Sequence, residues 1–306
     1  MSLDRIRLAS LHDKVISAEE ASAFIEDGMT VGMSGFTRAG EAKAVPLALV
    51  KRAHTNPLKI TLITGASLGN DLDKQLTEAG VLARRLPFQV DNTLRKAINN
   101  GEVMFIDQHL SETVEQMRNL QLKKPDVAII EAVAITEDGG IIPTTSVGNS
   151  ASFAIFAEKV IVEINTNLSP AFEGLHDIYI PTYRPTRQPI PLTQVDERIG
   201  THAINIDPAK IVGIVINNDL HDSPSTVTAP DDETQGIADH LIAFFEKEVA
   251  EERLPKNLGP LQAGIGSIAN AVLTGLKDSN FEDLVMYSEV LQDCTFELID
   301  AGKMKF

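Results

Sequence analysis

The stretch LQAGIGSIAN at residues 261–270 leads from a Gly-x-Gly turn directly into the apolar pattern of a helix. A short apolar strand, LVMYS at 284–288, follows that helix, and Glu289 comes immediately after the strand. Glycines allow backbone N–H groups to approach a ligand closely, and a helix N-terminus adds partial positive charge. Because ligands of open α/β sheets bind at the carboxyl ends of strands, we expect the turn and Glu289 to face one pocket.

Three interpretations fit this stretch. In the first, residues 264–269 match the G-x-G-x-x-G/A pattern of dinucleotide-binding folds, and an acidic residue follows near the spacing that would hold a ribose hydroxyl. The preceding residues 258–262 make a poor central strand for that motif, because they include glycine and proline. In the second, Glu289 is a nucleophile and the amides of the turn form an oxyanion hole. The third is purely structural, a helix start followed by an exposed glutamate.

These residues resemble the active-site pair of the acetyl-CoA hydrolase/transferase family, the class I CoA-transferases that include succinyl-CoA:acetate CoA-transferase. The resemblance is carried by QAGIGSIANAVL at 262–273 and YSEVLQD at 287–293. It continues in the family's order through SGFT at 34–37, TGAS at 64–67, EDGG at 137–140, TSVGNS at 145–150 and GLHDI at 174–178. The resemblance therefore covers essentially the whole chain.

The resemblance implies that the chain moves CoA between a short-chain acyl-CoA, such as acetyl-CoA or succinyl-CoA, and a carboxylate. Glu289 would attack the acyl-CoA carbonyl to give a mixed anhydride, and the returning CoA thiolate would leave a glutamyl-CoA thioester. The turn formed by Gly264, Ile265 and Gly266 would hold the oxyanion. Coenzyme A would take part as a substrate and acyl carrier, and no metal is expected.

The same resemblance implies which residues lie near the substrates. Ser67 matches a family position close to the small carboxylic acid, and the further substrate-binding candidates are Gly65, Asn270, Gly148 and Asn149. Hydrolysis through the same nucleophile is an alternative, in which water attacks the intermediate. A non-catalytic CoA-binding module and a dinucleotide oxidoreductase built on the Gly-x-Gly turn are the other two.

The domain organisation follows from the resemblance and from a change in composition. Family members are considerably longer, so we expect this sequence to be a piece of a longer protein. Residues 1–225 are predicted to form an N-terminal CoA-transferase-like α/β domain, with an open, mostly parallel sheet and helices on both faces. Residues 226–306 are predicted to begin a second such domain that carries the nucleophile. The boundary lies in a segment rich in Asp, Ser, Pro and Thr at 217–233.

Strands that alternate with helices predict the mostly parallel sheet. Apolar strands are expected at residues 29–33, 59–64, 103–107, 126–131, 159–164 and 210–216. Ser17 and Glu20 have the spacing of a capping box, and Ser111 is expected to cap another helix. Glu131 is predicted to end its strand, which makes it a rival carboxylate to Glu289 on position alone.

The net charge of −16 argues against nucleic acid or an anionic membrane as a partner. CoA and carboxylates are also anions, so local positive charge has to offset the overall field. The candidates are Arg84 with Arg85, Lys123 with Lys124, and Arg184 with Arg187, but we expect each of the three pairs to lie on a solvated surface.

The single cysteine, Cys294, excludes an internal disulfide and is expected to pack as a small apolar residue. No apolar run is long enough to span a bilayer, and the N-terminus lacks the apolar region of a signal peptide. We therefore expect a cytoplasmic protein, with a homodimer left open. His109 and His176 are expected to have structural roles.

Overall fold

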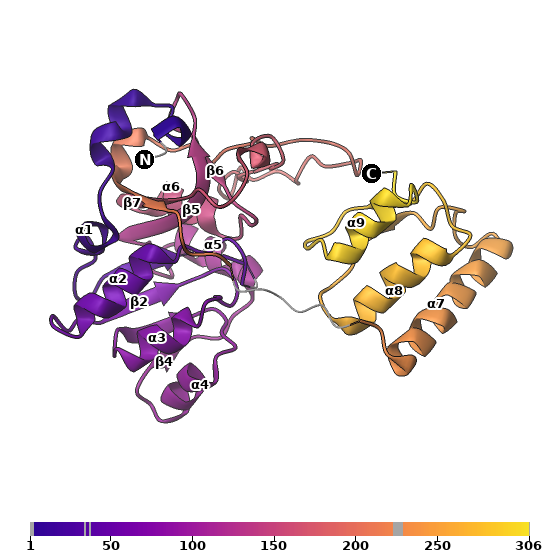
Figure 1. Cartoon of the computed structure of the whole chain (residues 1–306), viewed down its shortest axis with the longest axis horizontal. Coiled ribbons are helices and arrows are strands. Elements are labelled where there is room, and N and C mark those ends of the chain that lie inside the picture. The colour runs from indigo at the N-terminus through magenta and orange to yellow at the C-terminus, as the bar shows by residue number, and fades with distance from the viewer. Residues whose placement is uncertain (1–2, 34, 37, 223–228, 306) are drawn as a thin grey trace. The chain divides into compact units, whose positions relative to one another are not determined.

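The computed structural model describes residues 3–33, 35–36, 38–222 and 229–305 (Figure 1). The chain divides into two compact units, each of which we describe by itself. Unit 1 comprises Met1–Pro189 and Ile199–Ser223, and unit 2 comprises Ile190–Arg198 and Pro224–Phe306. The domain boundary predicted between residues 225 and 226 lies outside the described residues.

Unit 1 is built on one sheet, which has eight strands among the described residues. Their order is β4-β3-β2-β1-β5-β7-β8, and β6 pairs with β5. The β5–β6 pair is antiparallel and the other pairs are parallel, so the predicted mostly parallel sheet is confirmed. The strands are β1 (Thr30–Met33), β2 (Ile60–Ile63), β3 (Leu82–Leu86), β4 (Met104–Phe105), β5 (Val127–Ile135), β6 (Ile141–Pro143), β7 (Lys159–Asn165) and β8 (Ile211–Asn217).

Two strands of unit 1, β3 and β6, were not predicted from the sequence. The apolar run of β3 is interrupted by Arg84 and Arg85, and β6 is only three residues long. Arg85 is fully buried and pairs with Asp73, so the expectation of a solvated surface for this arginine is wrong. A buried ion pair of this kind depends on the neighbouring helix, which local sequence does not show.

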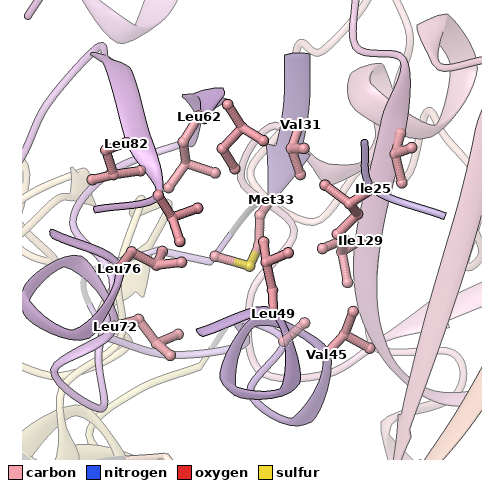
Figure 2. Packing of buried hydrophobic residues seen from close by; sticks show 14 of the residues in the cluster. Ile25, Val31, Met33, Val45, Leu49, Leu62, Leu72, Leu76, Leu82 and Ile129 are labelled. Atoms are coloured by element: carbon pink, nitrogen blue, oxygen red, sulfur yellow. The ribbon is translucent and has the colours of Figure 1, made fainter. Parts of the chain in front are cut away.

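The two faces of the sheet each carry a hydrophobic cluster. Alternate side chains of β5 divide between them: Val127 and Ile129 join one cluster, whereas Ala128 and Ile130 join the other. The first cluster includes side chains from helices α1 to α4, and Figure 2 shows its packing around Met33. The second includes side chains from α5 and α6. Helices therefore cover both faces, as predicted.

One of the two helix caps predicted in unit 1 is confirmed and the other is wrong. Ser17 and Glu20 form the expected capping box at α1, whereas His109 rather than Ser111 is the residue that precedes α5. The α-helices are α1 (Ala18–Ser22), α2 (Ala44–Ala53), α3 (Leu72–Glu78), α4 (Asn92–Asn99), α5 (Leu110–Arg118) and α6 (Ser150–Phe156). Short 3-10 helices lie at Leu3–Arg5, Ala9–Lys14, Pro170–Phe172 and Pro208–Lys210.

Unit 2 has a small sheet and three α-helices among its described residues. They follow the chain as α7 (Asp232–Ala250), β9 (Pro260–Leu261), α8 (Ser267–Asp278), β10 (Val285–Met286) and α9 (Asp293–Asp300). Helix α8 packs against both α7 and α9, in orange to yellow in Figure 1. Apolar side chains of α8, β10 and α9 form the core, and it includes Cys294, so the expectation that this thiol is packed and apolar is confirmed.

Candidate active site

The Gly-x-Gly turn and Glu289 lie at the same edge of the small sheet of unit 2. Strands β9 and β10 are parallel, with Val285 opposite Pro260 and Met286 opposite Leu261. The turn follows β9 and Glu289 follows β10, so both come from carboxyl ends of neighbouring strands. The register of the two strands thus places the two segments at one edge of the sheet, and that they face one pocket stays a prediction.

Two side chains that sequence reasoning missed join the turn to the segment that carries Glu289. The hydroxyl oxygen of Ser288 accepts from the N–H of Ala263 at 3.3 Å and lies 3.1 Å from the Ala263 carbonyl oxygen, to which it donates. The side-chain amide of Gln292 donates to the Gly264 carbonyl at 3.1 Å and accepts from the Gly266 N–H at 3.2 Å. Both lie in the quoted YSEVLQD stretch, but only the fold shows what they contact.

Glycine is required at Gly266 by the backbone rather than by crowding. Its φ is +129°, a conformation that L side chains rarely adopt, and a Cβ there would have no heavy atom within 4 Å. Ile265 is 59% exposed, and α8 starts with Ser267 immediately after the turn. The turn therefore presents backbone N–H groups at a helix N-terminus, the arrangement that favours developing negative charge.

Glu289 is exposed, and it forms no ion pair or hydrogen bond with any described residue. A carboxylate without a protein partner is free to act on a ligand, as a nucleophile requires. Asn270, another predicted site residue, lies inside α8 and is buried. Its N–H donates to the Gly266 carbonyl, so its backbone belongs to the first turn of the helix.

The other four predicted residues lie in unit 1, on two neighbouring loops. Gly65 and Ser67 follow β2 at the carboxyl edge of the large sheet, and both are buried. Gly148 and Asn149 directly precede α6, and the Asn149 side chain donates to the Thr64 carbonyl at 3.4 Å. The structure thus brings the two substrate-binding loops predicted in this unit together.

A buried charged cluster at this edge was not predicted as a unit. The ammonium group of Lys43 lies 2.5 Å from Glu131 and 2.7 Å from Asp222. Glu131 and Glu163 stand opposite each other on β5 and β7. Burial raises the pKa of Glu131 to about 7, although the nearby Lys43 ammonium opposes that effect. The only local indication of this cluster in the sequence was a glutamate in each of two apolar runs, Glu131 and Glu163.

The sequence predicted Glu131 at the end of its strand, but it is the fifth of nine residues in β5. It is 2% exposed and is held by Lys43 and by the hydroxyl of Thr144. Strand β5 continues past it because the following residues, Ala132–Ile135, are apolar and buried. The prediction that Glu131 ends its strand is therefore wrong, and its contacts with Lys43 and Thr144 are those of a structural group.

Glu163 closes the N-terminus of α2 from a neighbouring strand. Its carboxylate accepts from the N–H groups of Lys43 and Ala44 at 2.9 Å and of Val45 at 3.1 Å. These are N–H groups that a helix leaves without internal partners, so a carboxylate is well suited to them. Together with Lys43, Glu163 ties β7 to the start of the helix.

Glu41 lies beside the Ser67 loop. One of its carboxylate oxygens accepts from the Gly69 N–H and the Asn70 side chain, both at 3.1 Å. Burial raises the pKa of Glu41 above its usual value. The Arg38 N–H donates to the Ser67 carbonyl at 3.4 Å, so residues that follow β1 contact the loop that follows β2.

The remaining candidates are largely accounted for by structural contacts. His176 lies 3.0 Å from the Pro143 carbonyl, and burial lowers its pKa. Arg187 is 3.0 Å from Glu115, and Lys123 is 2.6 Å from Asp126. Within the part of the chain that the structure describes, no group of three or more His, Cys, Asp or Glu side chains could hold a metal, and no helix is long and apolar enough to cross a membrane.

Comparison with known proteins identifies relatives along the whole chain. Residues 2–216 match the model of the acetyl-CoA hydrolase/transferase N-terminal domain. The chain is 46% identical to a succinyl-CoA:acetate CoA-transferase from Clostridium kluyveri, over 98% of this chain and 56% of that protein. It is 43% identical to an acetyl-CoA hydrolase from Kluyveromyces lactis, over 99% of this chain and 60% of that protein. The chain thus spans less than two thirds of the length of these relatives.

Solved structures share the fold at low sequence identity. RipA from Yersinia pestis has a TM-score of 0.69 at 19% identity, over 96% of this chain and 60% of that one. A 4-hydroxybutyrate CoA-transferase from Porphyromonas gingivalis has a TM-score of 0.61 at 18% identity, over 96% and 59% of the two chains. The family match over residues 2–216 and the sequence identities together show that this chain belongs to the acetyl-CoA hydrolase/transferase family.

Proposed function

We propose that this chain contributes the nucleophile of a CoA-transferase that moves CoA between a short-chain acyl-CoA and a carboxylate. The observation that carries the proposal is Glu289, which is exposed, has no partner among the residues that the structure describes, and lies at the same sheet edge as the Gly-x-Gly turn. The relative from Clostridium kluyveri, named a succinyl-CoA:acetate CoA-transferase, supports succinyl-CoA as a CoA donor and acetate as an acceptor, with acetyl-CoA as the acyl-CoA formed. Coenzyme A is a substrate in this proposal.

The first half of the reaction cleaves the incoming thioester. A Glu289 carboxylate oxygen attacks the acyl carbonyl carbon, the C–S bond breaks, and CoA leaves as a thiolate to give an acyl-glutamyl anhydride. The turn formed by Gly264, Ile265 and Gly266 stabilises the negative oxygen that forms during the attack, through backbone N–H groups that have no partner in the described part of the turn. The CoA thiolate then attacks the glutamyl carbonyl, which releases the first carboxylate and leaves a glutamyl-CoA thioester.

The second half repeats these steps with a different acid. A second carboxylate attacks the glutamyl thioester and expels CoA thiolate, and the thiolate attacks the acyl carbon of the new anhydride. This step forms the product acyl-CoA and regenerates the Glu289 carboxylate. We assign the small acid to the Ser67 and Gly65 loop, with Gly148, Asn149 and Asn270 as further substrate-binding residues. The contact between the two loops of unit 1 supports the grouping of Gly65, Ser67, Gly148 and Asn149, whereas Asn270 is included on the family resemblance alone.

Hydrolysis is the second candidate, because several relatives are named acetyl-CoA hydrolases. Water would then attack the intermediate on Glu289 in place of the second carboxylate.

The proposal also includes a cytoplasmic location and a homodimer, and its partners are acyl-CoA and small carboxylic acids. A non-catalytic CoA-binding module would keep affinity for CoA but form no covalent intermediate.

Intact mass and peptide mapping after incubation with acetyl-CoA or succinyl-CoA test the proposal. The measurement uses this chain and the longest natural protein that contains it. We expect a CoA-sized adduct on Glu289, absent in Glu289→Ala and retained in Glu297→Ala, a nearby exposed glutamate paired with Lys277. Adduct discharge by acetate or succinate indicates a transferase, whereas discharge by water alone indicates a hydrolase. If both proteins bind CoA and neither forms an adduct, the transferase and the hydrolase with a Glu289 nucleophile are both excluded.

A further inference from the structure

The side-chain amide of Gln292 bridges two residues of the Gly-x-Gly turn. It donates to the Gly264 carbonyl and accepts from the Gly266 N–H, at 3.1 and 3.2 Å. Gln292 also precedes α9 as its N-cap residue, but its side chain makes no capping bond there. Asn, Asp, Ser and Thr are the usual residues at that position, because their short side chains reach the helix N–H groups. The longer glutamine side chain reaches the turn instead.

Packing does little to hold the turn in place. Beyond the adjacent residues of the chain, a Cβ atom placed on Gly264 or Gly266 would meet no heavy atom within 4 Å, and the Ile265 side chain is mostly exposed. The backbone of the turn is held instead by Ser288 and Gln292, whose side chains bond residues 263, 264 and 266. Both donors stand on the segment that carries Glu289, at one residue before it and three residues after it.

These hydrogen bonds also distinguish the N–H groups of the turn. The Gly266 N–H is already bonded to Gln292, so it is not the first donor for an oxyanion. The N–H groups of Gly264 and Ile265 have no hydrogen-bond partner among residues 229–305. Ile265 lies between the two residues that Gln292 bridges, and its N–H is therefore held by the bonds on either side.

We propose that Gln292 is a positioning residue that fixes the Ile265 N–H relative to the Glu289 carboxylate. This inference rests on the proposed function, because it assigns the turn a role in the attack by Glu289. A nucleophile and an oxyanion donor are effective only when their separation is held closely, and misplacement by about 1 Å can cost on the order of 100-fold in rate. Gln292 supplies that link because both its bonds cross from one segment to the other.

Two variants of Gln292 separate the two bonds. Gln292→Met has a similar length but makes neither bond, whereas Gln292→Glu keeps an acceptor for the Gly266 N–H and loses the donor to Gly264. The control is Gln235→Met on α7, which removes only a surface hydrogen bond to Asp239. The readouts are hydrogen exchange of the Gly266 N–H in protein labelled with ¹⁵N-glycine and the rate of adduct formation on Glu289 at increasing acyl-CoA concentration.

We expect Gly266 to exchange at least about 10-fold faster in Gln292→Met. The maximal rate of adduct formation should fall by about 10- to 100-fold, with the half-saturating acyl-CoA concentration unchanged. Gln292→Glu should keep the Gly266 protection yet still slow adduct formation. A merely structural role would instead lower the melting temperature of unit 2 and raise the half-saturating concentration.

The outcomes distinguish this inference from the function on which it rests. If the wild-type protein forms the adduct and Gln292→Met forms it equally fast, Gln292 does not position the turn and the inference is wrong. Unchanged protection of Gly266 in Gln292→Met would also overturn it, since the bond would then not exist in solution. If the wild-type protein forms no adduct, the proposed function itself fails, and the positioning role fails with it.

Discussion

Lys43 in unit 1 and Glu289 in unit 2 are both charged side chains at the carboxyl edge of parallel strands, yet their surroundings differ. Lys43 is buried between Glu131 and Asp222, whereas Glu289 is exposed and unpaired among the described residues. Groups locked in buried ion pairs hold the structure, because breaking one pair leaves an uncompensated charge. An unpaired carboxylate at the surface contributes little to stability and is available for chemistry. We therefore expect substitutions at Lys43 to change mainly stability and substitutions at Glu289 to change mainly activity.

The largest expected effect on stability is that of Lys43→Met. Removal of the ammonium leaves Glu131 and Asp222 without their cation, and we expect the free energy of unfolding of unit 1 to fall by about 3–5 kcal/mol. Urea denaturation with hydrogen exchange, read separately in peptides of each unit, measures the effect. Lys51→Met is the control, because Lys51 forms an exposed pair with Glu19 and should cost no more than about 1 kcal/mol. Equal losses in the two variants would contradict the comparison.

The pH dependence of stability should report the same cluster. The pKa of Glu131 rises from 4.5 in its ordinary state to about 7 in the fold, so the folded protein binds more protons between these values. Its contribution is fully present below about pH 4.5 and is lost as the pH rises through about 7. Between about pH 4.5 and 7, we expect the free energy of unfolding of the wild-type protein to fall by roughly 3 kcal/mol relative to that of Glu131→Gln. The free energy of unfolding of both proteins is measured by urea denaturation as a function of pH. If the two curves run parallel, the pKa of Glu131 is not raised by folding.

The conformation of the turn can be tested with two matched glycines. Gly266→Ala places a side chain at φ +129° and should cost about 1–3 kcal/mol in unit 2, together with slower adduct formation. Gly264→Ala has equally open space around its Cβ but does not have a positive φ, so it should change stability by no more than about 0.5 kcal/mol. Thermal unfolding of the two variants measures the difference. A similar cost at both positions would indicate crowding rather than backbone strain.

The smallest expected effect on stability is that of Glu289→Ala. Because the side chain is exposed and makes no bond within the described residues, its removal should change the free energy of unfolding by no more than about 0.5 kcal/mol. The same substitution should abolish the CoA adduct. Urea denaturation beside the mass measurement compares the two effects in one protein. A large loss of stability would mean that Glu289 has a structural partner, and the contrast with Lys43 would disappear.

Much of the fold is visible in local sequence. The capping box at Ser17, the apolar runs of β5 and β7, and the alternation of strands and helices all depend on neighbouring residues in the chain. The turn, the helix after it and the strand before Glu289 are visible in the same way, whereas β9 is not, because Gly259 and Pro260 weaken the strand pattern. Strand β3 was missed because an arginine pair interrupts it, and only pairing with β2 and β4 shows that it belongs to the sheet.

By itself, the sequence determined the family, the mostly parallel sheet and the nine candidate site residues. Tertiary structure decided which charges are buried together and which side chains hold the turn. Lys43, Glu131 and Glu163 meet only because β5 and β7 align in register beside the start of α2. Gln292 reaches Gly264 and Gly266 only because β9 and β10 are parallel neighbours. Such contacts join residues that are far apart in the chain. Their distances are set by how the strands and helices pack, so they cannot be read from the spacing of residues in the sequence.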